Sequence, residues 1–340
     1  QRQMCIRDRK YGELHAERNA IASLTESAEG AVIYVTLEPC CHHGKTPPCT
    51  EAIIEQKIKK VVIGSRDPNP KVAGKGVQML REAGVTVVED FMREECDQLN
   101  PVFFHYITMK TPYVVMKYAM TLDGKIATKT GASKWITSLA SRKEVQHMRH
   151  QYMGIMVGIG TVLEDDPMLN VRVEGWKSPV RIVCDSKLRI QLDSQIVKSA
   201  KKYRTIVAYA DQKNTGEKIK ILHTRGVETI YCPDEKNQID LKRLMIDLGN
   251  RGIDSILLEG GGTLNDSALR AGIVKEVQAF VAPKLFGGVA GKTPVEGVGV
   301  KFPSEAVELK YTDICQIGQD IRIRCQVCEK KQEESCLQES

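Results

Sequence analysis

One histidine and two cysteines near the N-terminus have the types and spacing of metal ligands. His15 stands two residues before Glu17, and Cys40 and Cys49 each follow a proline. One imidazole and two thiolates give Zn²⁺ three protein ligands and leave the fourth tetrahedral position for water, as in catalytic sites. Glu17 would then act on that water as a general acid/base without binding the metal. The pattern matches the zinc deaminase signature H-x-E…P-C-x-x-C, except that eight residues separate the two cysteines here.

Other interpretations of this cluster stay open at the level of sequence. An H-x-E segment alone occurs by chance in many proteins, so the cluster could be fortuitous. Cys41 could also replace Cys40 as a ligand, although the proline directly before Cys40 favours Cys40. A closed structural zinc site would draw its ligands from Cys40, Cys41, His42, His43 and Cys49.

The elements that must position these residues are predicted by hydrophobic periodicity. Glu17 lies at an expected helix start and Pro39 follows an expected strand, as the deaminase geometry requires. Alternating strands and helices favour a mostly parallel sheet covered by helices. We expect helices over residues 17–24, 50–60 and 76–83 and strands over residues 31–36, 61–64 and 85–88.

A second α/β series is predicted after residue 110, because the sequence pattern changes in the segment between Pro101 and Pro112. A chain of 340 residues favours two domains. We place them at 1–110 and 111–326, followed by a polar tail at 327–340. Helices are expected at 141–150 and 241–251, and strands at 113–118, 154–157, 181–184, 205–209, 255–258 and 276–281.

Two glycine-containing turns in the second series are suited to holding phosphate groups. Gly158 and Gly160 follow one predicted strand, and the glycines at 260–262 follow another, with a helix expected from about Asn265. Small residues let backbone amides approach phosphate oxygens closely at a helix N-terminus. A plain tight turn is the alternative. The fingerprint G-x-G-x-x-G is absent from the sequence, which argues against a Rossmann domain.

The composition narrows the class of protein. Apolar residues make up 42% and charged residues 27% of the chain, which excludes disorder and low complexity for its bulk. The net charge of +6 suits anionic small molecules, while an aromatic content of 5% disfavours stacking on nucleic acid. The 11 cysteines, together with the lack of a signal-peptide pattern or a long apolar stretch, predict a cytoplasmic protein with free thiols and no membrane partner.

Four segments resemble the bifunctional riboflavin-biosynthesis deaminase/reductase family. LEPCCHHGKTPPC at 37–49 and IGSRDPNPKVAGKGVQMLREAGV at 63–85 resemble its deaminase half, whereas K-x-A-x-T-L-D-G-K at 117–125 and S-x-W-I-T at 133–137 resemble its reductase half. The resemblance implies an α/β fold, with a cytidine-deaminase-like α/β/α domain followed by a dihydrofolate-reductase-like α/β domain. It also implies a longer segment before His15 than this sequence has, so residues 1–9 look foreign and the deaminase domain incomplete.

The same resemblance implies the cofactors and the site residues. The deaminase half would bind Zn²⁺ and the reductase half would use NADPH. Arg149 and Arg172 would clamp the substrate's phosphate, because guanidinium groups bind phosphate oxygens bidentately. The implied substrate contacts are Ser133, Arg149, Leu169, Arg172 and Glu259. The implied NADPH contacts are Ala119, Trp135, Thr161, Asp165, Ser186, Gly261, Gly262, Thr263, Leu264, Asn265, Asp266 and Ser267.

The implied function is two steps of riboflavin biosynthesis on a phosphorylated pyrimidine. The first half would deaminate 2,5-diamino-6-(5-phosphoribosylamino)pyrimidin-4-one, and the second would pass hydride from NADPH to the ribosyl group and give ribityl. The sequence singles out no acid or base in the second half. Relatives imply a homo-oligomer assembled through the reductase half. Three alternatives are a reductase with an inactive deaminase half, a nucleic-acid deaminase and a non-catalytic zinc-binding protein.

Overall fold

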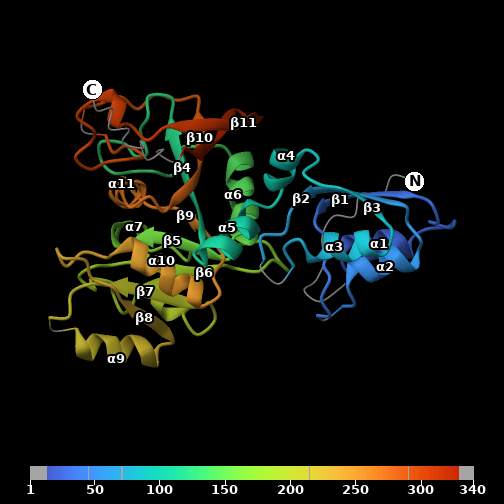
Figure 1. The fold of residues 1–340 in the computed structure, drawn as a ribbon. Coiled ribbons are helices and arrows are strands. Elements are labelled where there is room, and N and C mark those ends of the chain that lie inside the picture. Colours follow the sequence, from blue (N-terminus) through green and yellow to red (C-terminus); the bar gives the residue numbers. More distant parts are fainter. Residues whose placement is uncertain (1–13, 45, 70–71, 214, 290, 329–340) are drawn as a thin grey trace, which may run out of the picture. The chain divides into compact units, whose positions relative to one another are not determined.

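The computed structural model describes residues 14–44, 46–69, 72–213, 215–289 and 291–328, and the chain divides into two compact units (Figure 1). Unit 1 is Gln1–Met109 and unit 2 is Lys110–Ser340. The segment 1–9 and all but the first two residues of the predicted tail lie outside the described residues.

Unit 1 is built on a three-stranded parallel sheet in the order β1-β2-β3. Residues 61–65 of the central strand are all buried, which is typical of a parallel strand covered on both faces. The strands are β1 (Val32–Leu37), β2 (Lys60–Ser65) and β3 (Thr86–Val88). The helices are α1 (Ala16–Ala22), α2 (Cys49–Glu55), α3 (Lys75–Glu82), α4 (Arg93–Asp97) and α5 (Pro101–Met109).

The core of unit 1 forms between this sheet and the helices α2 and α3. Ile53 of α2, Ile63 of β2 and Leu80 of α3 are fully buried in one apolar cluster. The helix predicted over 50–60 ends earlier, at Glu55, because Lys57 adopts a left-handed conformation shortly before β2 begins. The predicted parallel pairing of these strands is confirmed.

Unit 2 contains a nine-stranded sheet in the order β11-β12-β10-β4-β9-β5-β6-β7-β8. The pairings from β10 to β8 are parallel, whereas β12 pairs antiparallel with both β10 and β11. The strands are β4 (Tyr113–Thr121), β5 (Gly154–Gly158), β6 (Val180–Cys184), β7 (Thr205–Tyr209), β8 (Val227–Tyr231), β9 (Ser255–Leu258), β10 (Val274–Ala282), β11 (Leu309–Ile317) and β12 (Asp320–Val327). The helices are α6 (Leu139–Gln151), α7 (Ile159–Asp165), α8 (Gln195–Lys198), α9 (Gly216–Thr224), α10 (Leu241–Asn250) and α11 (Gly262–Arg270).

Successive residues of β5 and β6 point into two different apolar cores. Met156 and Ile182 belong to one core, which also contains Leu244 of α10. Their neighbours Val157 and Val183 belong to the other. Because side chains alternate along a strand, both faces of this part of the sheet are buried.

The sequence prediction omits β8, β11 and β12. In β8 only Val227 and Ile230 are buried, so its apolar pattern is short. β11 stands at the edge of the sheet, and most of its residues are exposed. Edge strands carry polar residues and need no continuous apolar run, so the sequence of β11 resembles a loop.

Candidate active sites

The three predicted metal ligands come together in unit 1 from three different elements. His15 is the N-cap residue of α1, Cys40 follows β1, and Cys49 is the first residue of α2. Nδ1 of His15 lies 3.4 Å from Sγ of Cys40 and 3.4 Å from Sγ of Cys49. All three ligand atoms lie within 4.8 Å of one another, and the described part of the chain contains no other such group.

This geometry fits zinc. Zinc–nitrogen and zinc–sulfur bonds at tetrahedral angles place the two ligand atoms about 3.5 Å apart, in agreement with the observed separations of 3.4 Å. Three protein ligands leave one position for water or substrate. Cys41, His42 and His43 do not join the group, and His43 instead pairs with Glu51 at 2.9 Å. The alternative of a closed structural site is therefore not formed.

The long loop between the cysteines is fastened at both of its ends. Arg18 of α1 donates from Nε and Nη2 to the carbonyl oxygens of the two prolines before Cys49, at 2.9 and 2.6 Å. The backbone N–H of Cys49 donates to Sγ of Cys40 at 3.3 Å. Thr50 donates from both its N–H and its hydroxyl to the carbonyl oxygen of Cys40, each at 3.2 Å. These contacts keep both thiols close to His15 although the loop between the cysteines is long.

Glu17 lies against these ligands, and its carboxyl group has a raised pKa. Burial is the main cause, and the nearby Cys40 adds to it. The hydrogen bond with Cys49 lowers the pKa of Cys40 to about 5, and the pKa of Cys49 is raised. Cys40 is therefore available as the thiolate, the form that binds zinc.

Unit 2 contains a cavity of about 1230 Å³ at the carboxyl ends of β4, β5, β6 and β9, the edge where open α/β sheets bind ligands. All the predicted substrate contacts line it: Ser133, Arg149, Leu169, Arg172 and Glu259. Most of the predicted NADPH contacts also line it: Ala119, Trp135, Thr161, Asp165, Ser186, Gly261, Gly262, Thr263, Leu264 and Ser267.

Two predicted NADPH contacts, Asn265 and Asp266, do not line this cavity. The helix α11 begins at Gly262, earlier than the predicted start near Asn265, and both residues lie within it. The side chain of Asn265 is buried and donates to the carbonyl oxygen of Pro294 at 2.8 Å. Asp266 pairs with Arg270 at 2.9 Å. Both side chains therefore contact other residues of the chain and do not point into the cavity.

Gly262 allows the segment after β10 to pack directly on the start of α11. A Cβ atom at this position would lie 2.6 Å from the carbonyl oxygen of Thr293 and 2.4 Å from Cγ of Glu296. A side chain cannot be accommodated there without moving the backbone. Close packing of the segment at residues 293–296 thus requires a glycine at position 262, independently of the predicted approach of a phosphate.

The most deeply placed charges of the cavity form one group. Nε and Nη2 of Arg149 donate to the two oxygens of Glu259 at 2.7 and 3.0 Å, and Nζ of Lys117 lies 3.9 Å from Glu259. Burial alone would raise the pKa of Glu259, but Arg149 and Lys117 outweigh it and lower the pKa to about 2. Glu259 and the carbonyl oxygen of Asn170 take three of the five donors of Arg149, and its predicted phosphate clamp with Arg172 stays a prediction.

Lys117 is the candidate that the sequence reasoning missed. It stands on β4 with its side chain only 13% exposed, and it lines the cavity. Burial lowers its pKa, and Glu259 partly opposes that shift. The available signal was a lysine inside the apolar strand YVVMKYAM. Lysine is rarely buried without a partner, so such a position predicts a nearby carboxylate.

The two sites define the class of protein as a zinc-dependent deaminase joined to a reductase. The family model for the cytidine and deoxycytidylate deaminase zinc-binding region matches residues 6–65, and the model for the RibD C-terminal domain matches residues 112–323. The riboflavin biosynthesis protein RibD of Actinobacillus pleuropneumoniae is 55% identical over 312 residues, which cover 92% of this chain and 82% of that protein. This chain belongs to the RibD family, and the predicted bifunctional deaminase/reductase class is confirmed.

Solved structures agree with this family and with the predicted α/β fold. Acinetobacter baumannii RibD, form 1, matches with a TM-score of 0.80 and 35% identity over 94% of this chain and 87% of that one. A diaminohydroxyphosphoribosylaminopyrimidine deaminase/5-amino-6-(5-phosphoribosylamino)uracil reductase from Thermotoga maritima matches with a TM-score of 0.79 and 36% identity over 94% and 86%. The matches and the His15, Cys40 and Cys49 geometry support zinc and NADPH as the cofactors. Among the described residues, no helix has the length and apolar character needed to cross a membrane.

Proposed function

We propose that this chain catalyses two consecutive reactions of riboflavin biosynthesis, a deamination in residues 1–110 and a reduction in residues 111–326. The first converts 2,5-diamino-6-(5-phosphoribosylamino)pyrimidin-4-one into 5-amino-6-(5-phosphoribosylamino)uracil with release of ammonia. The second reduces the ribosyl group of that product to ribityl with NADPH. The observation that carries the proposal is the convergence of His15, Cys40 and Cys49 beside Glu17, in a chain that also holds the cavity of unit 2.

In the deamination, Glu17 moves the proton. Zinc, when bound, supplies Lewis-acid activation of a water molecule. The carboxylate of Glu17 takes a proton from this water while the water oxygen attacks C2, the ring carbon whose amino group is lost. Glu17 then passes the proton to the departing nitrogen, which leaves as ammonia. The raised pKa of Glu17 suits a group that must hold a proton part way through the reaction.

In the reduction, Lys117 supplies the proton that accompanies hydride transfer. NADPH, when bound, supplies the hydride to C1 of the ribosyl group. The bond between C1 and the ring oxygen breaks and that oxygen takes a proton, so that NADPH and one proton give NADP⁺ and the ribityl product. Lys117 lines the cavity beside Glu259, and its lowered pKa makes its proton easier to release.

We propose that Arg172, at the rim of the cavity, is the main guanidinium contact of the substrate phosphate. Arg172 lines the cavity and is exposed, whereas Arg149 is held by Glu259 and also donates to the carbonyl oxygen of Asn170 at 3.2 Å. An exposed guanidinium keeps its donors free for phosphate oxygens. Further basic side chains line the same cavity: Arg142, Lys143, Lys187 and Arg189.

Removal of zinc tests whether the two units catalyse the two reactions separately. Treatment with a chelator should abolish ammonia release, while NADPH oxidation with the deaminated substrate continues, because the ligands and the cavity belong to different units. Adding Zn²⁺ back should restore ammonia release. Ammonia release by the metal-free protein would contradict the proposal. A reductase with an inactive deaminase half predicts no ammonia before or after chelation, so the same assay separates that alternative.

Replacing Lys117 by methionine tests the proton donor of the reduction. Lys117→Met should lower kcat/KM for NADPH oxidation by about 10²–10⁴-fold, the usual contribution of a general acid. The wild-type kcat/KM should fall as the pH rises through the pKa of Lys117, because only the protonated amine donates. This fall should come below the ordinary lysine value of 10.5, since burial lowers the pKa.

Initial rates measured against pH check this prediction. Lys220→Met, which removes an exposed lysine of α9 outside this cavity, is the matched control and should keep the wild-type rate and pH profile. A Lys117→Met variant with wild-type rates would exclude the proposed role.

We further propose that the chain forms a homo-oligomer through unit 2, acts in the cytoplasm and works on small molecules and not on nucleic acid. The edge strand β11 exposes Tyr311 by 67% and Ile314 by 60%, and the adjacent β12 exposes Ile321 by 45%. An edge strand that exposes some apolar side chains favours pairing with a second chain. The aromatic content of 5% supports a small-molecule substrate.

A further inference from the structure

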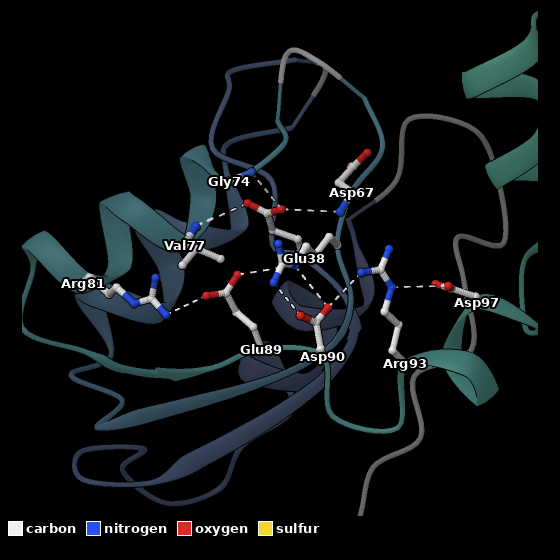
Figure 2. A network of polar contacts seen from close by, with 10 residues as sticks. Glu38, Asp67, Gly74, Val77, Arg81, Glu89, Asp90, Arg93 and Asp97 are labelled. Carbon is white, nitrogen blue, oxygen red and sulfur yellow. Dashed lines mark hydrogen bonds and ion pairs between the residues drawn. The ribbon is translucent and has the colours of Figure 1, made fainter. Parts of the chain in front are cut away.

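Glu38 stands between β1 and the ligand Cys40, and the chemistry proposed above does not use it. Its side chain is almost fully buried, with 3% of the residue exposed. Oε2 accepts the backbone N–H of Gly74 at 3.1 Å and that of Asp67 at 3.4 Å, and Oε1 accepts the N–H of Val77 at 3.3 Å (Figure 2). The buried carboxylate is thus stabilised by three backbone donors.

Two of these donors belong to the N-terminus of α3. Gly74 is the N-cap residue of this helix, and Val77 lies in its first turn. The N-cap glycine has no side chain that could accept the free N–H groups, so Glu38 accepts them from a distant part of the sequence. A negative charge at this end also interacts favourably with the helix dipole. Glu38 therefore ties the segment before Cys40 to α3.

The backbone next to Cys40 touches the same helix. A Cβ atom on Gly76 would lie 2.2 Å from the carbonyl oxygen of Pro39, so α3 packs directly on the peptide that precedes the ligand. On its other side, the carbonyl oxygen of Cys40 is held by Thr50 of α2. Cys40 is thus fixed between α3 and α2, and the carboxylate of Glu38 makes the polar contacts on the α3 side.

We propose that Glu38 is a positioning residue for the zinc site, an inference that rests on the proposed deaminase function. Its carboxylate holds residues 38–40 against α3, which keeps Sγ of Cys40 at the point where it meets His15. Glu38→Gln preserves size but replaces one acceptor oxygen by an NH₂ group, which cannot accept a backbone N–H. Residues that orient metal ligands typically contribute 10–100-fold to metal affinity, so the zinc affinity of Glu38→Gln should fall by about that factor.

The experiment compares Glu38→Gln with Glu89→Gln in the full chain. Glu89 belongs to the neighbouring network in Figure 2, where it accepts from Arg81 at 2.6 Å and is not adjacent in sequence to a metal ligand. The zinc dissociation constant is measured by competition with a chelating dye. Cobalt(II) is then bound in place of zinc, and its thiolate charge-transfer absorption reports how well both thiols coordinate. We expect weaker binding and weaker absorption for Glu38→Gln, and wild-type values for Glu89→Gln.

The outcomes separate this inference from the proposed function. Equal zinc affinity and equal cobalt spectra in Glu38→Gln and the wild type would overturn the role of Glu38 and leave the deaminase proposal standing. A wild-type chain that binds no zinc would overturn both. If Glu38→Gln unfolds unit 1, Glu38→Asp tests the same carboxylate, because it keeps both acceptor oxygens but draws them one methylene away from the N–H groups of Gly74 and Val77. A folded Glu38→Asp variant with wild-type zinc affinity would overturn the proposal.

Discussion

Replacing Glu17 by glutamine should lower the rate of deamination by about 10²–10⁴-fold, the usual contribution of a general acid/base. The amide has nearly the size of the carboxyl group but cannot take a proton from water. Glu17 is not among the three ligands, so zinc should remain bound at the wild-type stoichiometry. NADPH oxidation with the deaminated substrate should be unchanged, because the cavity lies in the other unit.

Ammonia release, metal content and NADPH oxidation are measured on the same preparation. Glu29→Gln is the matched control, since Glu29 is exposed in the same unit and pairs with Lys57 at 3.5 Å. The control should keep wild-type ammonia release. Wild-type deamination by Glu17→Gln would remove the proposed role of Glu17, and loss of zinc would show that it acts on the metal site itself. A non-catalytic zinc-binding protein predicts no change of function in this variant.

Replacing Arg181 by methionine should destabilise unit 2 by about 3 kcal/mol or more, because buried acceptors would lose their donor. Arg181 is fully buried. Its guanidinium donates to three carbonyl oxygens and two hydroxyl oxygens, at distances from 2.6 to 3.1 Å. No carboxylate is among these partners, so burial lowers the pKa of Arg181 to about 10. One carbonyl belongs to Met168, next to Leu169 of the cavity lining, so the reduction should also weaken.

Thermal unfolding checks this prediction. A loss of about 3 kcal/mol corresponds to a fall in Tm of roughly 6–12 °C for a unit of this size. Arg204→Met is the control, because Arg204 is exposed and pairs with Glu228 at 2.7 Å. A surface pair of this kind contributes about 0–1 kcal/mol. Equal Tm changes in the two variants would show that the buried hydrogen bonds of Arg181 stabilise the protein no more than a surface ion pair does.

The metal centre could be predicted from the sequence because its ligands lie in short motifs whose chemistry depends on residue type and spacing. His15, Cys40 and Cys49 needed only one helix start, one strand end and one further helix start to meet. The orientation of Cys40 could not be predicted in the same way. It depends on Glu38 and Gly76, which meet only after α3 folds back on the turn after β1.

The charges of the cavity were harder to predict. Arg149 and Glu259 were both singled out by resemblance, but their mutual pairing follows from tertiary packing between distant segments. The role of Lys117 is hard to predict from sequence, because its carboxylate partner Glu259 lies on a distant segment. Asn265 and Asp266 lie in the same segment as residues that line the cavity, but their side chains contact Pro294 and Arg270, and these contacts cannot be read from the segment itself.

The strand order of unit 2 also determines how the chain can fold during synthesis. β4 is the first strand of this unit to leave the ribosome, yet its two neighbours in the sheet, β9 and β10, are made near the end of the chain. Until they arrive, the apolar strand β4 has both edges unpaired, a state that favours association with other chains. Unit 1 ends at Met109, before β4 begins. The deaminase unit can therefore fold before the last strands of the reductase unit have been synthesised. Misfolding during synthesis is accordingly expected in the second half of the chain.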